Sequence, residues 1–263
     1  MMLRKRTNPM TFRLNSLRAA LAATLAAALL AAPARAGETL AAVAANFTEP
    51  ATEIAAAFTA ATGHTVTFSF GPAGQFYTQI AQGAPFEVFL SADQARPEKA
   101  EAEGFAVPGT RFTYAIGTLV LWSADPALID GTEAVLRRPD LAHVAIADPA
   151  AAPYGAAAVE TMQALGLYDS LQPKLVTGKS ISQAHQFVAT GNAPAGFVAL
   201  SQVIAEDKGS RWRVPAELHA PIRQDAVLLK AGETSEAARA FLDYLRTPEA
   251  RAIIERYGYA IED

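Results

Sequence analysis

The chain has 263 residues, no cysteine and a formal charge of −4 at pH 7. The lack of cysteine excludes disulfide bonds and thiolate metal sites, so the fold has to be stabilised by its apolar core. The acidic balance argues against binding to nucleic acid or to an anionic membrane through the overall field of the protein.

Residues 1–36 have the pattern of a secretory signal peptide. Basic residues come first, an apolar run follows from Ala19 to Ala32, and Ala34-Arg35-Ala36 provides a cleavage signal. A retained N-terminal anchor is the alternative, although the run is short for a membrane span. Cleavage would remove six Lys and Arg residues and no acidic ones, which leaves 16 positive and 26 negative residues and a formal charge of −10.

The mature sequence alternates strand-like and helix-like segments, which indicates an α/β fold with mainly parallel sheets. The first unit is a strand at Leu40–Ala44 followed by a helix that starts near Thr48, with Thr48 as its cap. Further strands are expected at residues 65–70, 86–90, 114–122, 144–147, 174–176, 196–200 and 226–230. Helices are expected at residues 75–81, 97–103, 154–165, 181–189, 202–205 and 235–257, with Ser180 and Ser201 as caps of the fourth and fifth.

Four strand-to-helix turns are small, rich in glycine, proline and serine, and precede a helix N-terminus. They are residues 45–48, 71–75, 152–155 and 178–181. The free N–H groups and the positive dipole end of a helix N-terminus can bind a small oxyanion without a cationic side chain. Asn46 adds a side-chain amide donor to the first turn, whereas Lys179 is interpreted as a solvated lysine. Any one of these turns alone is more simply an ordinary strand-to-helix connection.

The sequence contains little evidence of catalytic or metal-binding motifs. The four histidines are scattered, and the nucleophile motif G-x-S-x-G and the glycine-rich nucleotide-binding motifs are absent. Asp93 and Asp225 could serve an exported hydrolase as acid and base, but nothing in their spacing pairs them. Capping or ion pairing is the favoured interpretation of these carboxylates. We therefore expect no enzyme, no catalytic residue, no cofactor and no direct ligand to a metal ion.

Five segments carry a resemblance to a known family. They are AAVAANFT (41–48), SFGPAGQFYTQIAQGAPFEVFLSAD (69–93), DPAAAPYGAAAVETMQALG (148–166), GNAPAGFVALSQV (191–203) and PEARAIIERYGY (248–259). Together they resemble the periplasmic molybdate-binding proteins, the substrate-binding components of ABC importers, over essentially the whole mature chain. The resemblance implies a type II periplasmic binding protein: two α/β lobes, a two-strand hinge and a ligand cleft between the lobes.

The resemblance also implies the residue boundaries of the signal peptide and of the two lobes. Residues 1–36 would be the signal peptide, residues 38–117 plus 224–263 the first lobe, and residues 118–223 the second. The hinge strands would be Thr118–Trp122 and Ala226–Lys230.

In the family the oxyanion is held by helix N-terminal turns, two from each lobe. Carried over to this sequence, the ligand-binding residues would be Asn46, Ala73, Tyr154 and, through its backbone N–H, Ile181. Ala73 stands where many members have serine, and the lost hydroxyl would weaken binding about ten- to a hundredfold. Tyr154 would supply a phenol that other members place at the position of Ala199.

The function implied by the resemblance is capture of molybdate, and of tungstate as well, in the periplasm. The bound anion would be delivered to an inner-membrane ABC permease by a monomeric protein that does not bind nucleic acid. The alternative within the same fold is another anion, such as sulfate, phosphate or a small organic anion.

Overall fold

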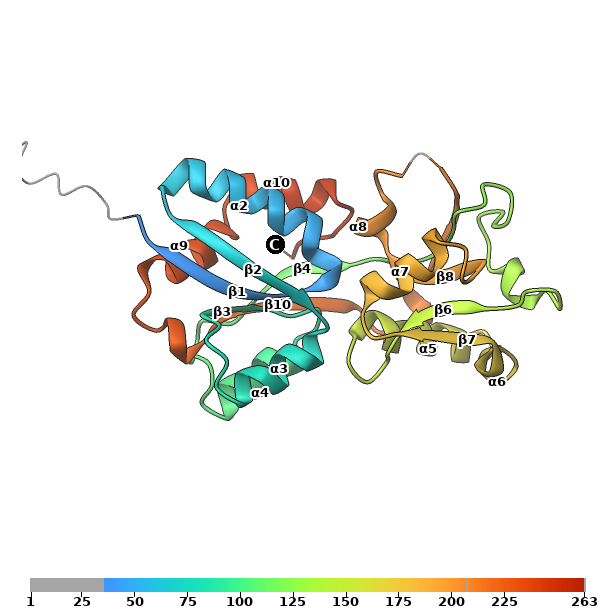
Figure 1. Ribbon diagram of the computed structural model, residues 1–263, viewed down its shortest axis with the longest axis horizontal. Coiled ribbons are helices and arrows are strands. Elements are labelled where there is room, and N and C mark those ends of the chain that lie inside the picture. The colour runs from blue at the N-terminus through green and yellow to red at the C-terminus, as the bar shows by residue number, and fades with distance from the viewer. Residues whose placement is uncertain (1–35, 207, 263) are drawn as a thin grey trace, which may run out of the picture. The chain divides into compact units, whose positions relative to one another are not determined.

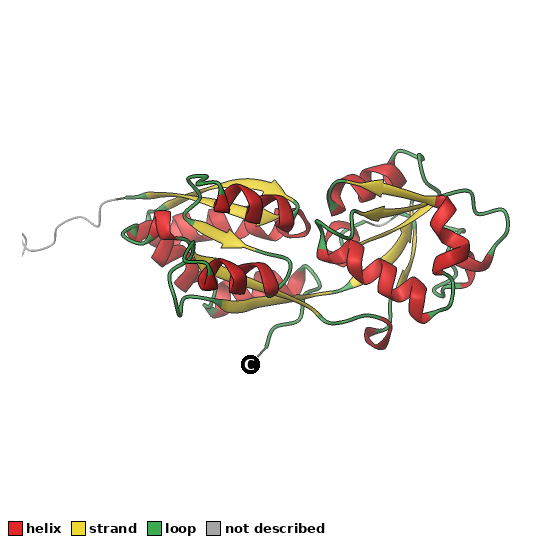
Figure 2. Cartoon of the chain, turned by 90° about the horizontal axis from the view of Figure 1, so that it is seen from below, coloured by secondary structure: helices red, strands yellow, loops and turns green. Residues whose placement is uncertain are grey.

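A computed structural model describes residues 36–206 and 208–262, so the expected signal peptide lies outside the described residues apart from Ala36. The strands form two five-stranded sheets with the orders β2-β1-β3-β10-β4 and β7-β6-β8-β5-β9. Each sheet with its helices is one α/β lobe, which confirms the predicted fold class, and Figures 1 and 2 show the two groups of strands.

The first lobe is built on β1 (Glu38–Ala44), β2 (Thr65–Gly71), β3 (Val88–Leu90), β4 (Phe112–Gly117) and β10 (Ile222–Leu228). Its helices are α2 (Thr48–Thr62), α3 (Ala73–Ala81), α4 (Ala95–Ala102), α9 (Glu236–Tyr244) and α10 (Pro248–Arg256). Strand β1 pairs in parallel with β2 and β3, whereas β10 runs antiparallel to β3 and β4. One aromatic core joins α2 to α9, with the rings of Phe58 and Phe241 5.3 Å apart in an edge-to-face arrangement.

The second lobe is built on β5 (Leu119–Ser123), β6 (Val144–Ala147), β7 (Leu175–Gly178), β8 (Ala195–Ala199) and β9 (Ser210–Arg213). Its helices are α5 (Pro153–Ala164), α6 (Tyr168–Leu171), α7 (Ile181–Ala189) and α8 (Leu200–Val203). The parallel strands β7, β6 and β8 end towards the first lobe, so the turns that follow β6 and β7 face the turns that follow β1 and β2 (Figure 1).

The chain crosses between the lobes at the ends of strands. Thr118 alone separates β4 in the first sheet from β5 in the second, and residues 214–221 return the chain from β9 to β10. The first crossing thus falls at the start of the predicted hinge strand Thr118–Trp122, most of which pairs within the second sheet as β5. The prediction of Ala226–Lys230 as the other hinge strand is wrong, because the second crossing precedes β10 and β10 pairs within the first sheet. A continuous β-type sequence from Tyr114 to Trp122 does not reveal where the pairing partner changes.

The cap at the first turn also differs from the prediction. A short 3₁₀ turn, η1 (Ala45–Phe47), follows β1, and Phe47 occupies the position before α2. Thr48 lies inside the helix and donates its hydroxyl to the carbonyl of Ala45, 2.9 Å away. The predicted cap at Ser180 is confirmed, since its Oγ accepts the N–H of Gln183 at 3.2 Å.

Two further helices differ from their predictions. Ser201 lies within α8 rather than capping it, and its hydroxyl donates to the carbonyl of Asn46. The predicted C-terminal helix is two helices, because Pro248 starts a new one that Thr247 caps. Among residues 36–206 and 208–262, no helix combines the length and apolarity needed to span a bilayer.

Candidate anion site

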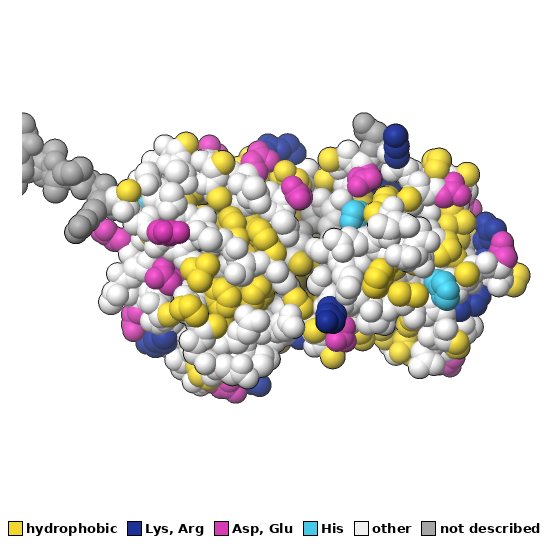
Figure 3. All heavy atoms as spheres, in the orientation of Figure 1, with side chains coloured by type: hydrophobic (Ala, Val, Ile, Leu, Met, Phe, Trp, Pro, Cys, Tyr) yellow, Lys and Arg dark blue, Asp and Glu magenta, His cyan; other side chains and the backbone are white. Residues whose placement is uncertain are grey.

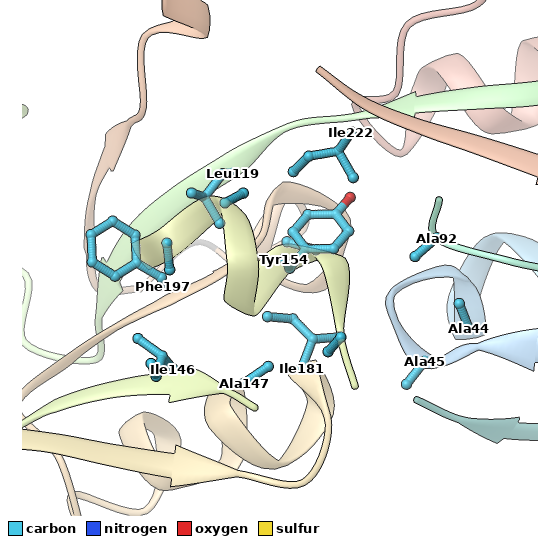
Figure 4. Packing of buried hydrophobic residues seen from close by; sticks show 14 of the residues in the cluster. Ala44, Ala45, Ala92, Leu119, Ile146, Ala147, Tyr154, Ile181, Phe197 and Ile222 are labelled. Carbon is cyan, nitrogen blue, oxygen red and sulfur yellow. The ribbon is translucent and has the colours of Figure 1, made fainter. Parts of the chain in front are cut away.

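Four strand-to-helix turns meet at one small cavity between the lobes. Its volume is about 10 Å³, roughly that of one water, and all four predicted residues line it. The full lining is Ala44, Ala45, Asn46, Gly71, Pro72, Ala73, Ala92, Ala152, Pro153, Tyr154 and Ile181. Figure 4 shows Ala44, Ala45 and Ala92 of the first lobe opposite Tyr154 and Ile181 of the second. The structure therefore brings together turns that are up to 136 positions apart in the sequence.

The donors at this cavity are backbone N–H groups at helix starts. Helix α3 begins at Ala73 and α7 at Ile181, and the first N–H groups of a helix have no acceptor inside it. Helix α5 begins at Pro153, which has no N–H, so Tyr154 carries its first N–H group. Each helix adds the positive end of its dipole, so the site favours an anion.

The cavity has neutral walls. The described residues that line it include no Lys, Arg, Asp or Glu, and the predicted surface position of Lys179 is confirmed by its exposure. The guanidinium of Arg96 lies nearby, but it pairs with Asp93 and donates to the carbonyl of Ala150 at 2.9 Å. An anion held here would be stabilised by dipoles and N–H groups rather than by a counter-charge.

The side chain of Asn46 is buried and already bonded within the protein. Its Nδ2 donates to Oε1 of Gln224 at 2.8 Å and to Oη of Tyr259 at 3.0 Å. The backbone carbonyl of Asn46 accepts from Ser201 Oγ at 2.8 Å and from Tyr259 Oη at 2.7 Å. These bonds fix the orientation of the first turn. Direct contact between the Asn46 amide and an anion stays a prediction, and it requires one of these bonds to be exchanged.

The phenol of Tyr154 points past the cavity towards the crossover between the lobes. Its Oη accepts from Nε2 of Gln224 at 3.3 Å. A Cβ atom placed on Gly117 would lie only 2.0 Å from that Oη, so the hydroxyl occupies space that only glycine leaves free. The ring of Tyr154 lines the cavity, while the role of its hydroxyl as an anion donor stays a prediction.

Sequence reasoning did not find the polar residues behind the cavity. Gln224, Tyr259 and Ser201 form one buried network with Asn46. The one available signal was Gln224-Asp225 at the head of an apolar strand, because buried polar groups in a strand need partners.

Comparison with known proteins identifies the family. The family model described as bacterial extracellular solute-binding protein matches residues 39–260. Molybdate-binding protein ModA of Rhodobacter capsulatus is 69% identical over 233 residues, which cover 89% of this chain and 92% of the relative. The chain belongs to the molybdate-binding proteins of this solute-binding family.

Two further comparisons, both with Azotobacter vinelandii, support this family assignment. Molybdate-binding protein ModA of Azotobacter vinelandii is 56% identical over 92% of this chain and 97% of its own length. The solved structure of a periplasmic molybdate-binding protein from Azotobacter vinelandii superposes with a TM-score of 0.81 at 44% identity, over 86% of this chain and all of that one.

The two carboxylates considered for a hydrolase have structural partners in this family member. Asp225 is fully buried and accepts from Arg111 Nη1 and from Thr113 Oγ1, both at 2.7 Å. Asp93 accepts the N–H of Arg96 at 3.0 Å and pairs with its guanidinium. The predicted roles of capping and ion pairing are confirmed. Within the described part of the chain no group of three His, Asp or Glu residues could hold a metal ion.

The buried tyrosines stay protonated at neutral pH. Burial raises the pKa of Tyr259 to about 12, and it raises the pKa values of Tyr154 and Tyr114 well above the ordinary value. Their hydroxyls therefore remain neutral hydrogen-bonding groups behind the cavity.

Stability at high pH is expected to report this burial. Tyr259 ionises near pH 10 in the unfolded chain and near pH 12 in the folded chain. The contribution of its buried, protonated hydroxyl to the free energy of unfolding is therefore complete below pH 10 and is lost as pH rises to 12. Within this window the wild type should lose about 1.4 kcal/mol per pH unit more than Tyr259→Phe. Denaturant unfolding of both proteins at several pH values measures the difference, with Tyr168→Phe as the control. Equal slopes for wild type and Tyr259→Phe would contradict the burial of that phenol.

Proposed function

We propose that this chain captures molybdate in the periplasm and delivers it to an ABC permease of the inner membrane. The observation that carries the proposal is the meeting of the N-termini of α3, α5 and α7 with the 3₁₀ turn η1, two turns from each lobe, at one cavity with neutral walls. The name of the Rhodobacter capsulatus relative, at 69% identity, supports molybdate as the ligand. Export of the mature chain by the signal peptide at residues 1–36 belongs to the same proposal.

Binding would proceed by closure of the two lobes on the anion. We place the first lobe at the predicted residues 38–117 plus 224–263 and the second at 118–223. The pairing of β10 with β4 from Ile222 supports a start of the second segment of the first lobe about two residues before the predicted residue 224. A tetrahedral oxyanion is larger than one water, so the cavity of about 10 Å³ has to open and reclose around it. Closure removes water from the anion and exchanges its hydration for fixed N–H donors.

We further propose that the protein acts without covalent chemistry, without a cofactor and as a monomer. Tungstate should bind as well, since it is a tetrahedral dianion of nearly the same size. On the face seen in Figure 3, Lys and Arg side chains are interspersed with Asp and Glu, which supports a small anion rather than nucleic acid as the partner.

Titration calorimetry on the chain from Gly37 tests this function. Molybdate, tungstate, sulfate and phosphate are injected separately at one ionic strength. We expect tight binding of the first two anions and weak or absent binding of the others. Binding of sulfate or phosphate without molybdate would replace the proposed ligand, and heat from none of the four would overturn an oxyanion function.

Adding back a hydroxyl at the start of α3 is expected to tighten binding. Ala73→Ser places an Oγ on the first residue of α3, which lines the cavity, and a hydrogen bond to a charged ligand should gain about tenfold in affinity. Calorimetry with molybdate measures the gain. The same substitution at exposed Ala61 on α2 is the matched control. An affinity for Ala73→Ser equal to that of Ala61→Ser would show that the anion does not reach this turn.

A further inference from the structure

Gln224 occupies an unusual position in the strand that re-enters the first lobe. It is fully buried on β10, and the pairing with β4 shifts register between Gln224 and Asp225. A register shift of this kind re-aims side chains that would otherwise alternate between the two faces. Asp225 accepts hydrogen bonds from Arg111 and Thr113, which hold this part of β10 in place. Gln224, the residue before it, is thereby kept beside the anion cavity.

The amide of Gln224 contacts anion-binding turns from both lobes. Its Oε1 accepts from Asn46 Nδ2 at 2.8 Å and from Tyr114 Oη at 3.1 Å, both in the first lobe. Its Nε2 donates to Tyr154 Oη at 3.3 Å, which belongs to the second lobe. A single primary amide thus satisfies an acceptor and donors at once, which neither a carboxylate nor an apolar side chain of that size can do.

The contact with Tyr154 depends on how α5 lies against the crossover. The Tyr154 hydroxyl fits over Gly117, where an added Cβ would lie 2.0 Å from Oη and 2.8 Å from Gln224 Nε2. Gly117 is the last residue of β4, next to the crossing at Thr118. Any rotation of the second lobe about this crossing therefore changes the Gln224–Tyr154 distance directly.

We propose that Gln224 is a positioning residue that couples closure of the lobes to the orientation of the first anion-binding turn. It orients Asn46 from behind, and it bonds Tyr154 only when the second lobe has closed. The inference rests on the proposed function. Because the bond forms in the closed state, it should slow release of the anion and leave capture nearly unchanged.

A double-mutant cycle on molybdate release tests the coupling. Gln224→Met keeps the length of the side chain and removes its amide, and Tyr154→Phe removes only the hydroxyl. Each single variant should speed dissociation about three- to tenfold, with association within about a factor of two of wild type. The double variant should dissociate no faster than the faster single variant, because the Gln224–Tyr154 bond that Tyr154→Phe removes is already absent in Gln224→Met. Gln163→Met, on the exposed side of α5, is the matched control.

Stopped-flow dissociation and thermal unfolding separate coupling from a merely structural role. Dissociation in the double variant equal to the product of the two single effects would overturn the coupling. A lowered Tm with wild-type dissociation would overturn it as well. Should Gln224→Met not fold, Tyr154→Phe alone decides, and an unchanged dissociation rate refutes the proposal. A wild type that binds no molybdate overturns the function and the coupling together, whereas an additive cycle in a wild type that binds overturns the coupling alone.

Discussion

Replacing Gly117 with alanine is expected to weaken molybdate binding about 10- to 100-fold while the chain stays folded. The new Cβ would lie 2.0 Å from Tyr154 Oη and 2.8 Å from Gln224 Nε2, so the second lobe cannot reach its closed position. The larger cost falls on closure, because the atom nearest to the new Cβ belongs to Tyr154 of the other lobe, whereas the approach to Gln224 is within the first sheet. Calorimetry measures the affinity, and small-angle scattering with excess molybdate measures the closure.

A second substitution identifies the cause of this effect. Tyr154→Phe removes the atom that the new Cβ meets first, so Gly117→Ala with Tyr154→Phe should recover part of the lost affinity. Circular dichroism of each variant checks that the fold is intact. Wild-type affinity in Gly117→Ala would contradict the close approach of Tyr154 to the crossover, and so would the absence of any recovery in the double variant.

Replacing Ile181 with proline is expected to weaken binding by about ten- to a hundredfold, through the loss of one backbone donor. Ile181 is the first residue of α7, where proline is tolerated because its φ angle suits the helix and no intrahelical hydrogen bond is lost. Ser180 before it has φ −142° and ψ 167°, an extended conformation compatible with a following proline. The cap from Ser180 to the N–H of Gln183 is retained.

Ile181→Val is the control for this experiment, because it shortens the buried side chain and keeps the N–H. We expect its affinity for molybdate to stay close to that of wild type. If Ile181→Pro and Ile181→Val bind within a factor of two of each other, the backbone N–H of Ile181 does not hold the anion.

The anion turns could be predicted from sequence because their signal is local. Gly71-Pro72-Ala73-Gly74 and Thr177-Gly178-Lys179-Ser180 each interrupt a strand and precede an apolar period of 3.6, which fixes the place of a helix N-terminus within about two residues. Helix α3 nevertheless begins at Ala73 rather than at the predicted Gln75. That difference places the Ala73 N–H at the helix start, where it is free to bind a ligand.

The network behind the cavity could not be predicted in the same way. Asn46 and Gln224 are 178 positions apart, and their contact depends on β10 returning to the first sheet after the whole second lobe. No periodicity within a window of residues encodes such a contact. The roles of Tyr154 and Gly117 depend in turn on the angle between two lobes, which is a property of tertiary packing and not of local propensity.

X-ray diffraction at the molybdenum absorption edge, from crystals of the chain grown with molybdate, would locate the bound anion. We expect one strong anomalous peak enclosed by Asn46, Ala73, Tyr154 and Ile181, with the N–H groups of α3, α5 and α7 directed at the anion. A neighbouring cavity of about 310 Å³ is lined by residues that include Arg96 and Arg223, and it is the alternative position for the anion. A peak beside these arginines, with none at the helix starts, would contradict the claim that neutral helix N-termini hold the anion.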